Sequence, residues 1–327
     1  VATGFVQGGE VEDPSAQSID VIRIPALGRS ISPIKDHLAR KQLEAIVADV
    51  KPDIIHTHTF KAGYITRMKK QSIPVVHTFH GHLLDDPEFS GFKSKVIIAI
   101  ERKLAKKSAK LVTVGEIVGQ ELLEKRIGVK EQYTSIAPGV VALDVTERAE
   151  ALNNCGVADN GQPIIGWIAR VTGVKNPMKA LEVARAIPNA QFVIAGGGDL
   201  IEDVIAAAPA NVSVIGWAKA EDLFGASDLI LSTSENEGMP VALIEAQLAG
   251  KPVVATNVGS VSEVIADGET GLVTDKNPRS LISALNTLIG DTGKCAAMST
   301  LAASRAQSLF SVERMINAHI ALYKSIV

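Results

Sequence analysis

The chain has few cysteines and no long apolar run. Its two cysteines, Cys155 and Cys295, are too few for a disulfide framework, and their separation does not match a zinc-ligand pair. The longest uncharged run, residues 204–218, is interrupted by Pro209 and Asn211 and falls short of the roughly 18 apolar residues that a membrane-spanning helix needs. These absences exclude a disulfide-rich scaffold and a membrane-spanning chain. They favour a protein of the reducing cytoplasm.

A strong net charge is also lacking. The 33 Lys and Arg nearly balance the 36 Asp and Glu, so the net charge of −3 gives no basis for nucleic acid binding. The balance is uneven along the chain: residues 1–140 carry a net +4, residues 141–327 a net −7, and residues 61–110 a net +7. In a chain of 327 residues, this split predicts two domains with different partners.

Short β-branched runs alternate with helical patterns along most of the chain, which predicts parallel βαβ units. The expected strands are almost continuously apolar, as strands covered on both faces are, so each half is expected to be a doubly wound α/β sheet. The expected strands cover residues 20–24, 53–57, 74–78, 111–114, 163–169, 191–195, 212–216, 228–232, 252–256 and 271–274.

The periodicity lapses in the segment LNNCGVADNGQP, which is where we expect the domain boundary. We predict an N-terminal, acceptor-side domain over residues 1–145 and a C-terminal domain over residues 146–310. Residues 311–327 have the spacing of a helix with Ser311 as N-cap, and this helix is expected to pack back towards the first domain.

Residues 232–273 carry the strongest functional signal and are expected to run strand, loop, helix, strand. Glu237 lies in the loop, Gly238 lets the backbone approach a ligand closely, and Pro240 suits a first helical turn. A helix N-terminus at the carboxyl end of a parallel strand binds phosphate, and carboxylates accept hydrogen bonds from vicinal hydroxyls. With Glu245 two turns further on, the pattern predicts a site for a diphosphate flanked by two sugars. Each Glu taken alone also fits an exposed surface residue.

The same segment resembles the retaining glycosyltransferases of the GT-B class, family 4. The resemblance rests on Glu237-x7-Glu245, on GKPVV from Gly250 and on GETGL from Gly268, and it extends over residues 50–327. It implies two Rossmann-like domains facing a cleft and a nucleotide diphosphate sugar as donor, UDP rather than GDP. It also implies that Glu237 contacts the donor sugar and Glu245 the ribose, and that no metal or other cofactor is required.

The diphosphate needs cations, and GWIARVTGVKNP offers two. Arg170 ends an expected strand and Lys175 follows five residues later, which resembles the family's Arg-x4-Lys clamp on the β-phosphate. The glycines of residues 195–200 form either a ligand-facing loop or a plain turn, and Trp217 is either a donor-site neighbour or a packing residue. The further donor-site residues implied by the resemblance are Gly81, Gly216, Gly238, Met239, Pro240 and Val241.

Histidines concentrate near two expected strand ends. On the resemblance, His80 reaches the reacting carbon of the donor, and Gly81 allows the close approach. His56 and His58 then shape the cleft or are polar residues near the core. Together with Asp85 and Asp86, the cluster also suits a metal-dependent hydrolase, which leaves the second-half motifs unexplained. A nucleotide-sugar epimerase on the same fold is a second alternative. The clustered residues are His56, His58, His77, His80 and His82.

The chain departs from the family pattern at two places. Gly115 stands where the family commonly has Ser, so a hydroxyl contact from that turn is absent or made elsewhere. Residues 1–5 match the family's second strand better than its first, so we expect the opening strand-helix unit to be missing. Gly8 and Gly9 are therefore not assigned to the donor site, and a binding-only protein is a further alternative.

We thus predict a retaining glycosyltransferase that transfers a sugar to a hydroxyl of a sugar or lipid-linked sugar, in polysaccharide or glycolipid biosynthesis. Its catalytic residues are expected to be His80, Arg170, Lys175 and Glu237. Basic residues at 61–110 form either a solvated helix face or a surface that docks on anionic lipids at the inner face of a membrane. These residues are Lys61, Arg67, Lys69, Lys70, Lys93, Lys95, Arg102, Lys103, Lys106, Lys107 and Lys110.

Overall fold

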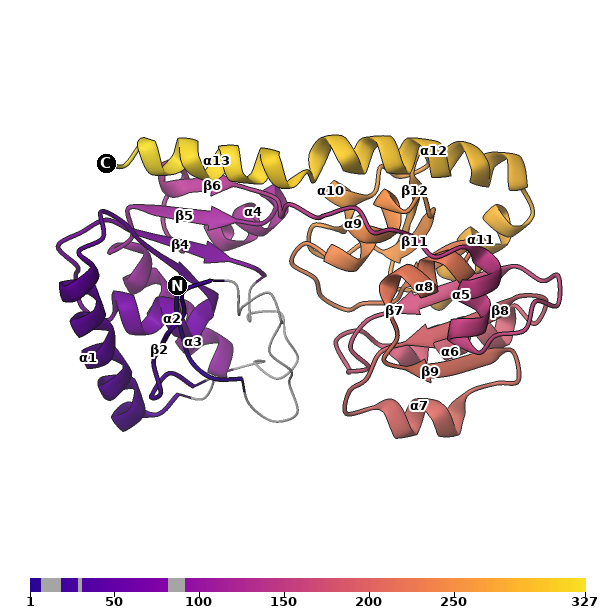
Figure 1. Ribbon diagram of the computed structural model, residues 1–327, viewed down its shortest axis with the longest axis horizontal. Coiled ribbons are helices and arrows are strands. Elements are labelled where there is room, and N and C mark those ends of the chain that lie inside the picture. Colours follow the sequence, from indigo (N-terminus) through magenta and orange to yellow (C-terminus); the bar gives the residue numbers. More distant parts are fainter. Residues whose placement is uncertain (7–18, 29–30, 82–91) are drawn as a thin grey trace.

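The structure, a computed structural model, describes residues 1–6, 19–28, 31–81 and 92–327. It contains two Rossmann-like α/β domains side by side, each built on a parallel sheet, with two long helices running across both (Figure 1). This is the GT-B arrangement expected from the sequence. No helix in these described ranges is both long and apolar enough to cross a membrane.

The N-terminal domain is built on a four-stranded sheet of order β3-β4-β5-β6 and a separate parallel pair, β1-β2. A cavity of about 640 Å³ lies between that pair and β3, lined mainly by their residues and by the two helices α1 and α2. The elements are β1 (Ala2–Thr3), β2 (Ile22–Arg23), α1 (Pro33–Val50), β3 (Ile55–His58), α2 (Thr59–Arg67), β4 (Val75–Phe79), α3 (Phe92–Ala105), β5 (Lys110–Thr113), α4 (Glu116–Glu124) and β6 (Tyr133–Ser135).

The C-terminal domain is built on a six-stranded parallel sheet of order β12-β11-β10-β7-β8-β9. Strands β10 and β11 are buried along their whole length because helices cover both faces of the sheet. The elements are α5 (Arg148–Cys155), β7 (Ile164–Ile168), α6 (Pro177–Ala186), β8 (Gln191–Ala195), α7 (Ile201–Ala207), β9 (Val212–Gly216), α8 (Ala220–Ala226), β10 (Leu229–Ser232), α9 (Val241–Leu248), β11 (Val253–Thr256), α10 (Val261–Val264), β12 (Gly271–Thr274), α11 (Pro278–Ile289) and α12 (Thr292–Leu309).

The last helix, α13 (Val312–Lys324), returns to the N-terminal domain. Ser311 is its N-cap and accepts a hydrogen bond from the amide of Arg314. Leu322 packs with Val76 and Val112 of the N-terminal sheet, so the end of the chain completes the core of the first domain.

Two elements, α5 and β6, were not expected from the sequence. The periodicity lapse at LNNC does not end the regular structure, because α5 continues to Cys155 and stops only at Gly156, which adopts the left-handed conformation. The polar side chains of Asn153 and Asn154 lie on its exposed face. Strand β6 was not expected, because it is three residues long and only partly buried.

Two of the basic residues assigned to a possible lipid-docking surface are buried. Lys61 donates to Asp36 at 2.5 Å, and Arg67 donates to Glu101 at 3.1 Å with no exposed side-chain area. Each of these cations is held by a carboxylate inside the domain, so the expectation that they belong to an exposed basic face is wrong. The remaining basic residues of this set, from Lys69 to Lys110, are exposed or partly exposed.

Candidate functional site

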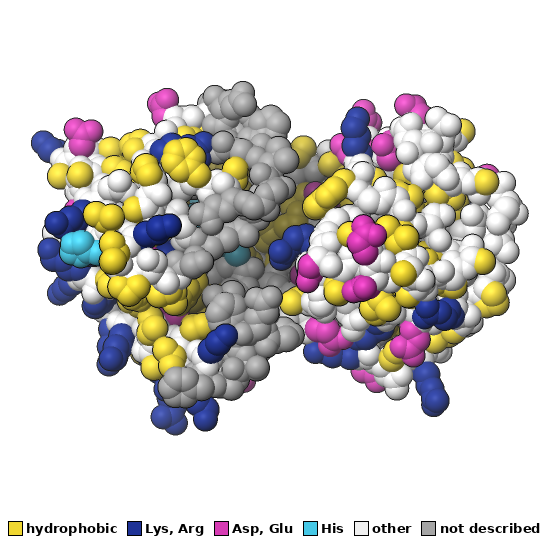
Figure 2. Space-filling view, turned by 90° about the horizontal axis from the view of Figure 1, so that it is seen from below, with side chains coloured by type: hydrophobic (Ala, Val, Ile, Leu, Met, Phe, Trp, Pro, Cys, Tyr) yellow, Lys and Arg dark blue, Asp and Glu magenta, His cyan; other side chains and the backbone are white. Residues whose placement is uncertain are grey.

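A cavity of about 250 Å³ opens where strands β7 and β10 end. These neighbours in the sheet are the point where the strand order reverses, and open α/β sheets bind ligands at that point. Seen from below, the molecule is hollowed between its two domains (Figure 2). The cavity is lined by Trp167, Ile168, Ala169, Lys175, Leu231, Ser232, Ser234, Glu237, Met239, Pro240, Val241, Ala242 and Leu243.

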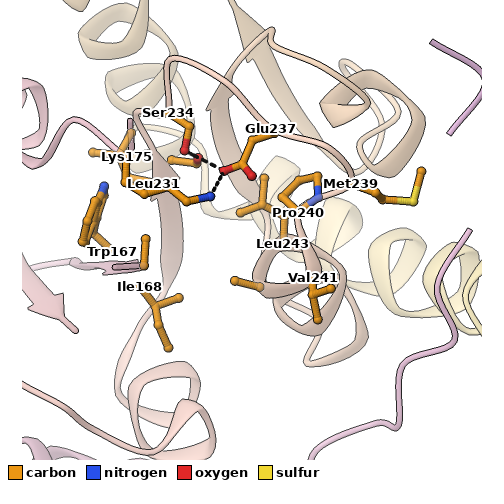
Figure 3. Close-up of a pocket in the computed structure, with 13 residues that line it drawn as sticks. Trp167, Ile168, Lys175, Leu231, Ser234, Glu237, Met239, Pro240, Val241 and Leu243 are labelled. Atoms are coloured by element: carbon orange, nitrogen blue, oxygen red, sulfur yellow. Dashed lines mark hydrogen bonds and ion pairs between the residues drawn. The ribbon is translucent and has the colours of Figure 1, made fainter. Parts of the chain in front are cut away.

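The charged centre of the cavity is an ion pair between Lys175 and Glu237. Lys175 Nζ lies 2.5 Å from Glu237 Oε1, and the Ser234 hydroxyl donates to the same oxygen at 2.7 Å (Figure 3). The carboxylate is largely enclosed, with 9% of its side chain exposed, whereas 20% of the lysine side chain is exposed. The two residues therefore present a cation and a fixed carboxylate to the same small space.

The loop that carries Lys175 is anchored to the strand end beneath it. Thr233 Oγ1 accepts a hydrogen bond from the Trp167 indole at 2.9 Å and lies 3.0 Å from the carbonyl oxygen of Lys175. Asn176 is left-handed, with φ of 48°, and its side chain caps α6. A second carboxylate, Glu235, accepts from Asn176 and from nearby lysines, so the loop is fixed from both sides.

Helix α9 points its N-terminus at the cavity. Its N-cap is Pro240, which has no side-chain oxygen to occupy the first amides, and Val241 and Ala242 line the cavity. The unpaired amides and positive dipole of a helix start attract anions. Met239 is buried in the core, so it fixes the entry of the chain into α9. The arrangement therefore suits a phosphate group between α9 and Lys175.

The two domains meet backbone to backbone beside this cavity. A Cβ atom on Gly238 would lie 2.1 Å from the carbonyl oxygen of His80, and one on Gly81 would lie 3.3 Å from the Cα of Gly238. Gly81 also has φ of +135°, which side chains rarely allow. His80 is exposed at this contact. The structure thus brings His80 and Gly81 from one domain to Gly238, next to Glu237, of the other.

Six expected site residues do not line this cavity: His80, Gly81 and Gly238, described above, and Arg170, Gly216 and Glu245. Arg170 is exposed and forms no ion pair within the described residues. The carbonyl oxygen of Gly216 accepts from the amide of Gly196, at the end of the neighbouring strand. Glu245 lies on α9, half-buried; burial, and then the nearby Glu221, raise the pKa of its carboxyl group. The packing alternative for Trp217 is wrong, because 79% of it is exposed.

The glycines of residues 195–200 pack tightly against the protein. A Cβ on Gly196 would lie 1.9 Å from the carbonyl oxygen of Ala169, and one on Gly197 would lie 2.4 Å from the indole nitrogen of Trp217. These glycines therefore allow neighbouring loops to approach each other.

The histidines are engaged in separate contacts. His56 bonds to Tyr323 at 2.6 Å and to Thr78 at 2.7 Å, so it links β3 to α13 and β4. The nitrogens of His58 and His80 lie 2.9 Å apart. His77 is buried and bonds to Thr57, and its Nε2 has no partner among the residues that the structure describes.

These contacts do not converge on a metal. Among the residues that the structure describes, no group of three or more His, Cys, Asp or Glu is arranged to hold one. His82, Asp85 and Asp86, together with Gly8 and Gly9, lie outside the described residues. The hydrolase alternative is therefore not favoured by the described geometry.

Ser234, Thr233 and Glu235 belong to the site and were not expected from the sequence. Ser234 orients Glu237, Thr233 anchors the Lys175 loop, and Glu235 binds Lys179 at 2.6 Å. These residues could have been predicted from their position: they follow directly after a fully buried strand, in a polar run that continues to Glu237.

Family profiles match both halves of the chain. The profile described as glycosyl transferases group 1 matches residues 151–305, and the profile described as glycosyltransferase family 4 matches residues 4–142. Together they cover most of both domains.

Individual proteins are similar over most of their length. UDP-Gal:alpha-D-GlcNAc-diphosphoundecaprenol alpha-1,3-galactosyltransferase of Escherichia coli is 28% identical, covering 83% of this chain and 75% of that protein. The fold is similar to that of sucrose-phosphate synthase from Thermosynechococcus elongatus, with TM-score 0.82, 18% identity and coverage of 93% and 82% of the two chains. It is also similar to Anabaena Alr3699/HepE in complex with UDP-glucose, with TM-score 0.80, 18% identity and coverage of 99% of each chain.

The buried His56 makes stability pH-dependent. Burial, and then the neighbouring His58, lower the pKa of His56 from 6.5 to about 3. The unfolded chain therefore binds more protons below pH 6.5, and the free energy of unfolding falls as the pH falls towards 3. Discounted for the partial exposure of the ring, we expect a loss of about 1 kcal/mol between pH 6.5 and pH 5.

Urea unfolding of the unaltered protein and of His56→Gln at pH 7 and pH 5 measures this loss. Gln does not titrate, so the variant should be less stable at pH 7 but less sensitive to acid. The same pH sensitivity in both proteins would contradict the role given to the ring.

Proposed function

This chain belongs to the group 1 glycosyltransferases, family 4, of the GT-B fold, which transfer sugar from a nucleotide sugar, and we propose that it is a retaining enzyme that uses a UDP-sugar. The observation that carries the proposal is the joint presence, in one cavity, of Lys175, Glu237 and the uncapped start of α9. The UDP-linked names of the Escherichia coli and Anabaena relatives support UDP over GDP. The acceptor would be a hydroxyl of a sugar or lipid-linked sugar, in polysaccharide or glycolipid synthesis.

The diphosphate would lie between the first amides of α9 and Lys175, with Arg170 closing over it. Lys175, Arg170 and the helix dipole together would balance the charge of the leaving diphosphate, so this chemistry needs no metal ion. Glu237, fixed by Ser234, would accept hydrogen bonds from the donor sugar. Glu245 would hold the ribose further along the same helix.

In the transfer step, the acceptor oxygen bonds to the anomeric carbon as the bond from that carbon to the β-phosphate oxygen breaks. The proton of the acceptor hydroxyl passes to the leaving phosphate oxygen, on the same face of the sugar. Glu237 is already paired with Lys175, which makes it a poor nucleophile for a double displacement. His80 would position the sugar from the acceptor side, which is formed by the first domain, residues 1–145. The second domain, residues 146–310, would bind the donor. The helix of residues 311–327 would join the two domains.

We expect Lys175→Ala to lower kcat for transfer by about 10²- to 10³-fold, because one preorganised charge on the leaving group is lost. Glu237→Gln should also lose most of its activity. Lys130→Ala is the matched control, since this lysine is exposed and belongs to the other domain. Transfer assays with and without a chelator measure both effects. Full activity in Lys175→Ala would refute its role, and a strict metal requirement would favour a hydrolase.

Nucleotide binding should raise the melting temperature, because a ligand that binds only the folded state stabilises it. We expect UDP and a UDP-sugar to give larger shifts than GDP or ADP in a thermal-shift panel. Incubation of the same donor without acceptor separates the alternatives: a transferase hydrolyses it slowly, whereas an epimerase converts it to its epimer. A larger shift with GDP would overturn the donor assignment.

Peripheral membrane contact is the remaining part of the proposal. Lys61 and Arg67 are buried and do not belong to the basic surface. Three exposed lysines on α3 still do: Lys93, Lys95 and Lys103. Each basic residue near an anionic surface contributes about 1 kcal/mol. We expect co-flotation with anionic vesicles at low salt that is lost at high salt and in Lys93→Gln/Lys95→Gln/Lys103→Gln. Equal behaviour towards neutral and anionic vesicles would contradict it.

A further inference from the structure

A carboxylate of the C-terminal domain caps a helix of the N-terminal domain. The two oxygens of Glu263, on α10, accept hydrogen bonds from the amides of Glu116 and Ile117, each at 2.9 Å. These residues begin α4, whose N-cap Gly115 has no side chain to satisfy them. A carboxylate at a helix start is favoured both by the unpaired amides and by the helix dipole. The contact between the domains is therefore directional and charge-assisted.

Gly115 provides the space that this contact needs. A Cβ at this position would lie 2.1 Å from Ser260 Oγ and 2.6 Å from Glu263 Oε1. The φ angle of Gly115 is −153°, which any residue adopts, so space and not backbone conformation requires glycine. Ser260 Oγ is buried and has no hydrogen-bond partner among the residues described. The hydroxyl that the family pattern places at position 115 is thus found on the opposite domain.

The same segment is tied to the donor-site loop. The amide of Ser260 donates to the carbonyl oxygen of Gly238 at 2.9 Å, and Gly238 is the residue whose backbone lies against His80. At the other end of α10, Arg305 of α12 donates to the carbonyl oxygens of Val264 and Glu263. Residues 260–264 therefore form a short rigid bridge from α4 to the loop that carries Glu237.

We propose that Glu263 is a positioning residue for sugar transfer. By capping α4, it holds the domains at the separation at which His80 and Glu237 face the same donor. It does not line the cavity, so it acts through the position of the domains and not by contact with the donor. The inference rests on the roles proposed above for His80 and Glu237.

Two variants test the bridge from opposite sides. Glu263→Ala removes both hydrogen bonds, and Gly115→Ala inserts a methyl group into the contact. For the loss of two charge-assisted hydrogen bonds we expect kcat/KM for transfer to fall about 10- to 100-fold. The thermal shift given by UDP should remain, because the donor site lies in the C-terminal domain. Glu202→Ala, which removes an exposed carboxylate on α7 of the same domain, is the matched control and should transfer normally.

A compensating pair tests direct contact. Ser260→Gly removes the two atoms of Ser260 that an alanine at position 115 would meet. The Glu263 oxygen, 2.6 Å from that methyl group, still has to move. We therefore expect the double variant Gly115→Ala/Ser260→Gly to recover part of the activity lost in Gly115→Ala, whereas a general folding defect would not be recovered. Small-angle scattering should show a larger radius of gyration for Glu263→Ala and Gly115→Ala than for the unaltered protein and the control.

Three results would overturn the inference: unchanged transfer in both variants, an unchanged radius of gyration, or loss of the UDP shift in proportion to the loss of transfer. Loss of the UDP shift would mean that residues 260–264 support the donor site and do not set the position of the domains. If the unaltered protein transfers nothing from UDP-sugars, the proposed donor has failed. The radius of gyration of the variants, which needs no activity, still decides whether Glu263 holds the domains together.

Discussion

The approach of two backbones across the cleft is the constraint on which the rest of the structure depends. At Gly238 and at His80–Gly81 the chains of the two domains are so close that no side chain fits between them. The backbone of Gly259 also lies close to the Glu237 loop: a Cβ on Gly259 would lie 1.8 Å from the carbonyl oxygen of Glu237. Three layers of main chain are stacked there. The position of the Glu237 carboxylate follows from this stacking, with little freedom left to its own loop.

Charge is distributed around that stack in complementary pairs. Lys175 shares Glu237 with a serine hydroxyl, while Glu235 holds Lys179 and Lys276 on the outer side of the same loop. The lysines of the site are therefore held by carboxylates that are themselves fixed, so little rearrangement is needed before a ligand can bind to them. Preorganised groups of this kind stabilise developing charge without a reorganisation cost at the moment of reaction. Arg170 is exposed and follows Ala169, which lines the cavity.

The sequence predicted most of the fold because the strands of a parallel sheet are apolar along their whole length. The expected strands at residues 191–195, 212–216 and 271–274 coincide with β8, β9 and β12. Strand β6 escaped detection because three part-buried residues give no such run. The burial of Lys61 and Arg67 was equally invisible, because their partners, Asp36 and Glu101, lie 25 and 34 residues away and only the tertiary fold brings them together.

For the site, the sequence identified residues whose chemistry is local to a strand end, such as Lys175 and Glu237. It did not identify those whose role depends on the opposite domain. Gly115 was noticed only as a departure from a family pattern. Its meaning required Ser260 and Glu263, some 145 residues further on, and only a distance across the cleft relates them. Local pattern therefore predicted Lys175 and Glu237, which line one cavity, but not the contact of Glu263 with α4.

The return of the chain through α13 bears on how the protein is made. Both ends of the chain lie with the N-terminal domain, and the C-terminal domain is formed by the stretch between (Figure 1). The first domain packs Val76, Val112 and Ile136 against Leu322, and it places Tyr323 on His56. A ribosome delivers those last residues only after the whole second domain has emerged. The first domain therefore gains this part of its core only after the second domain has been synthesised.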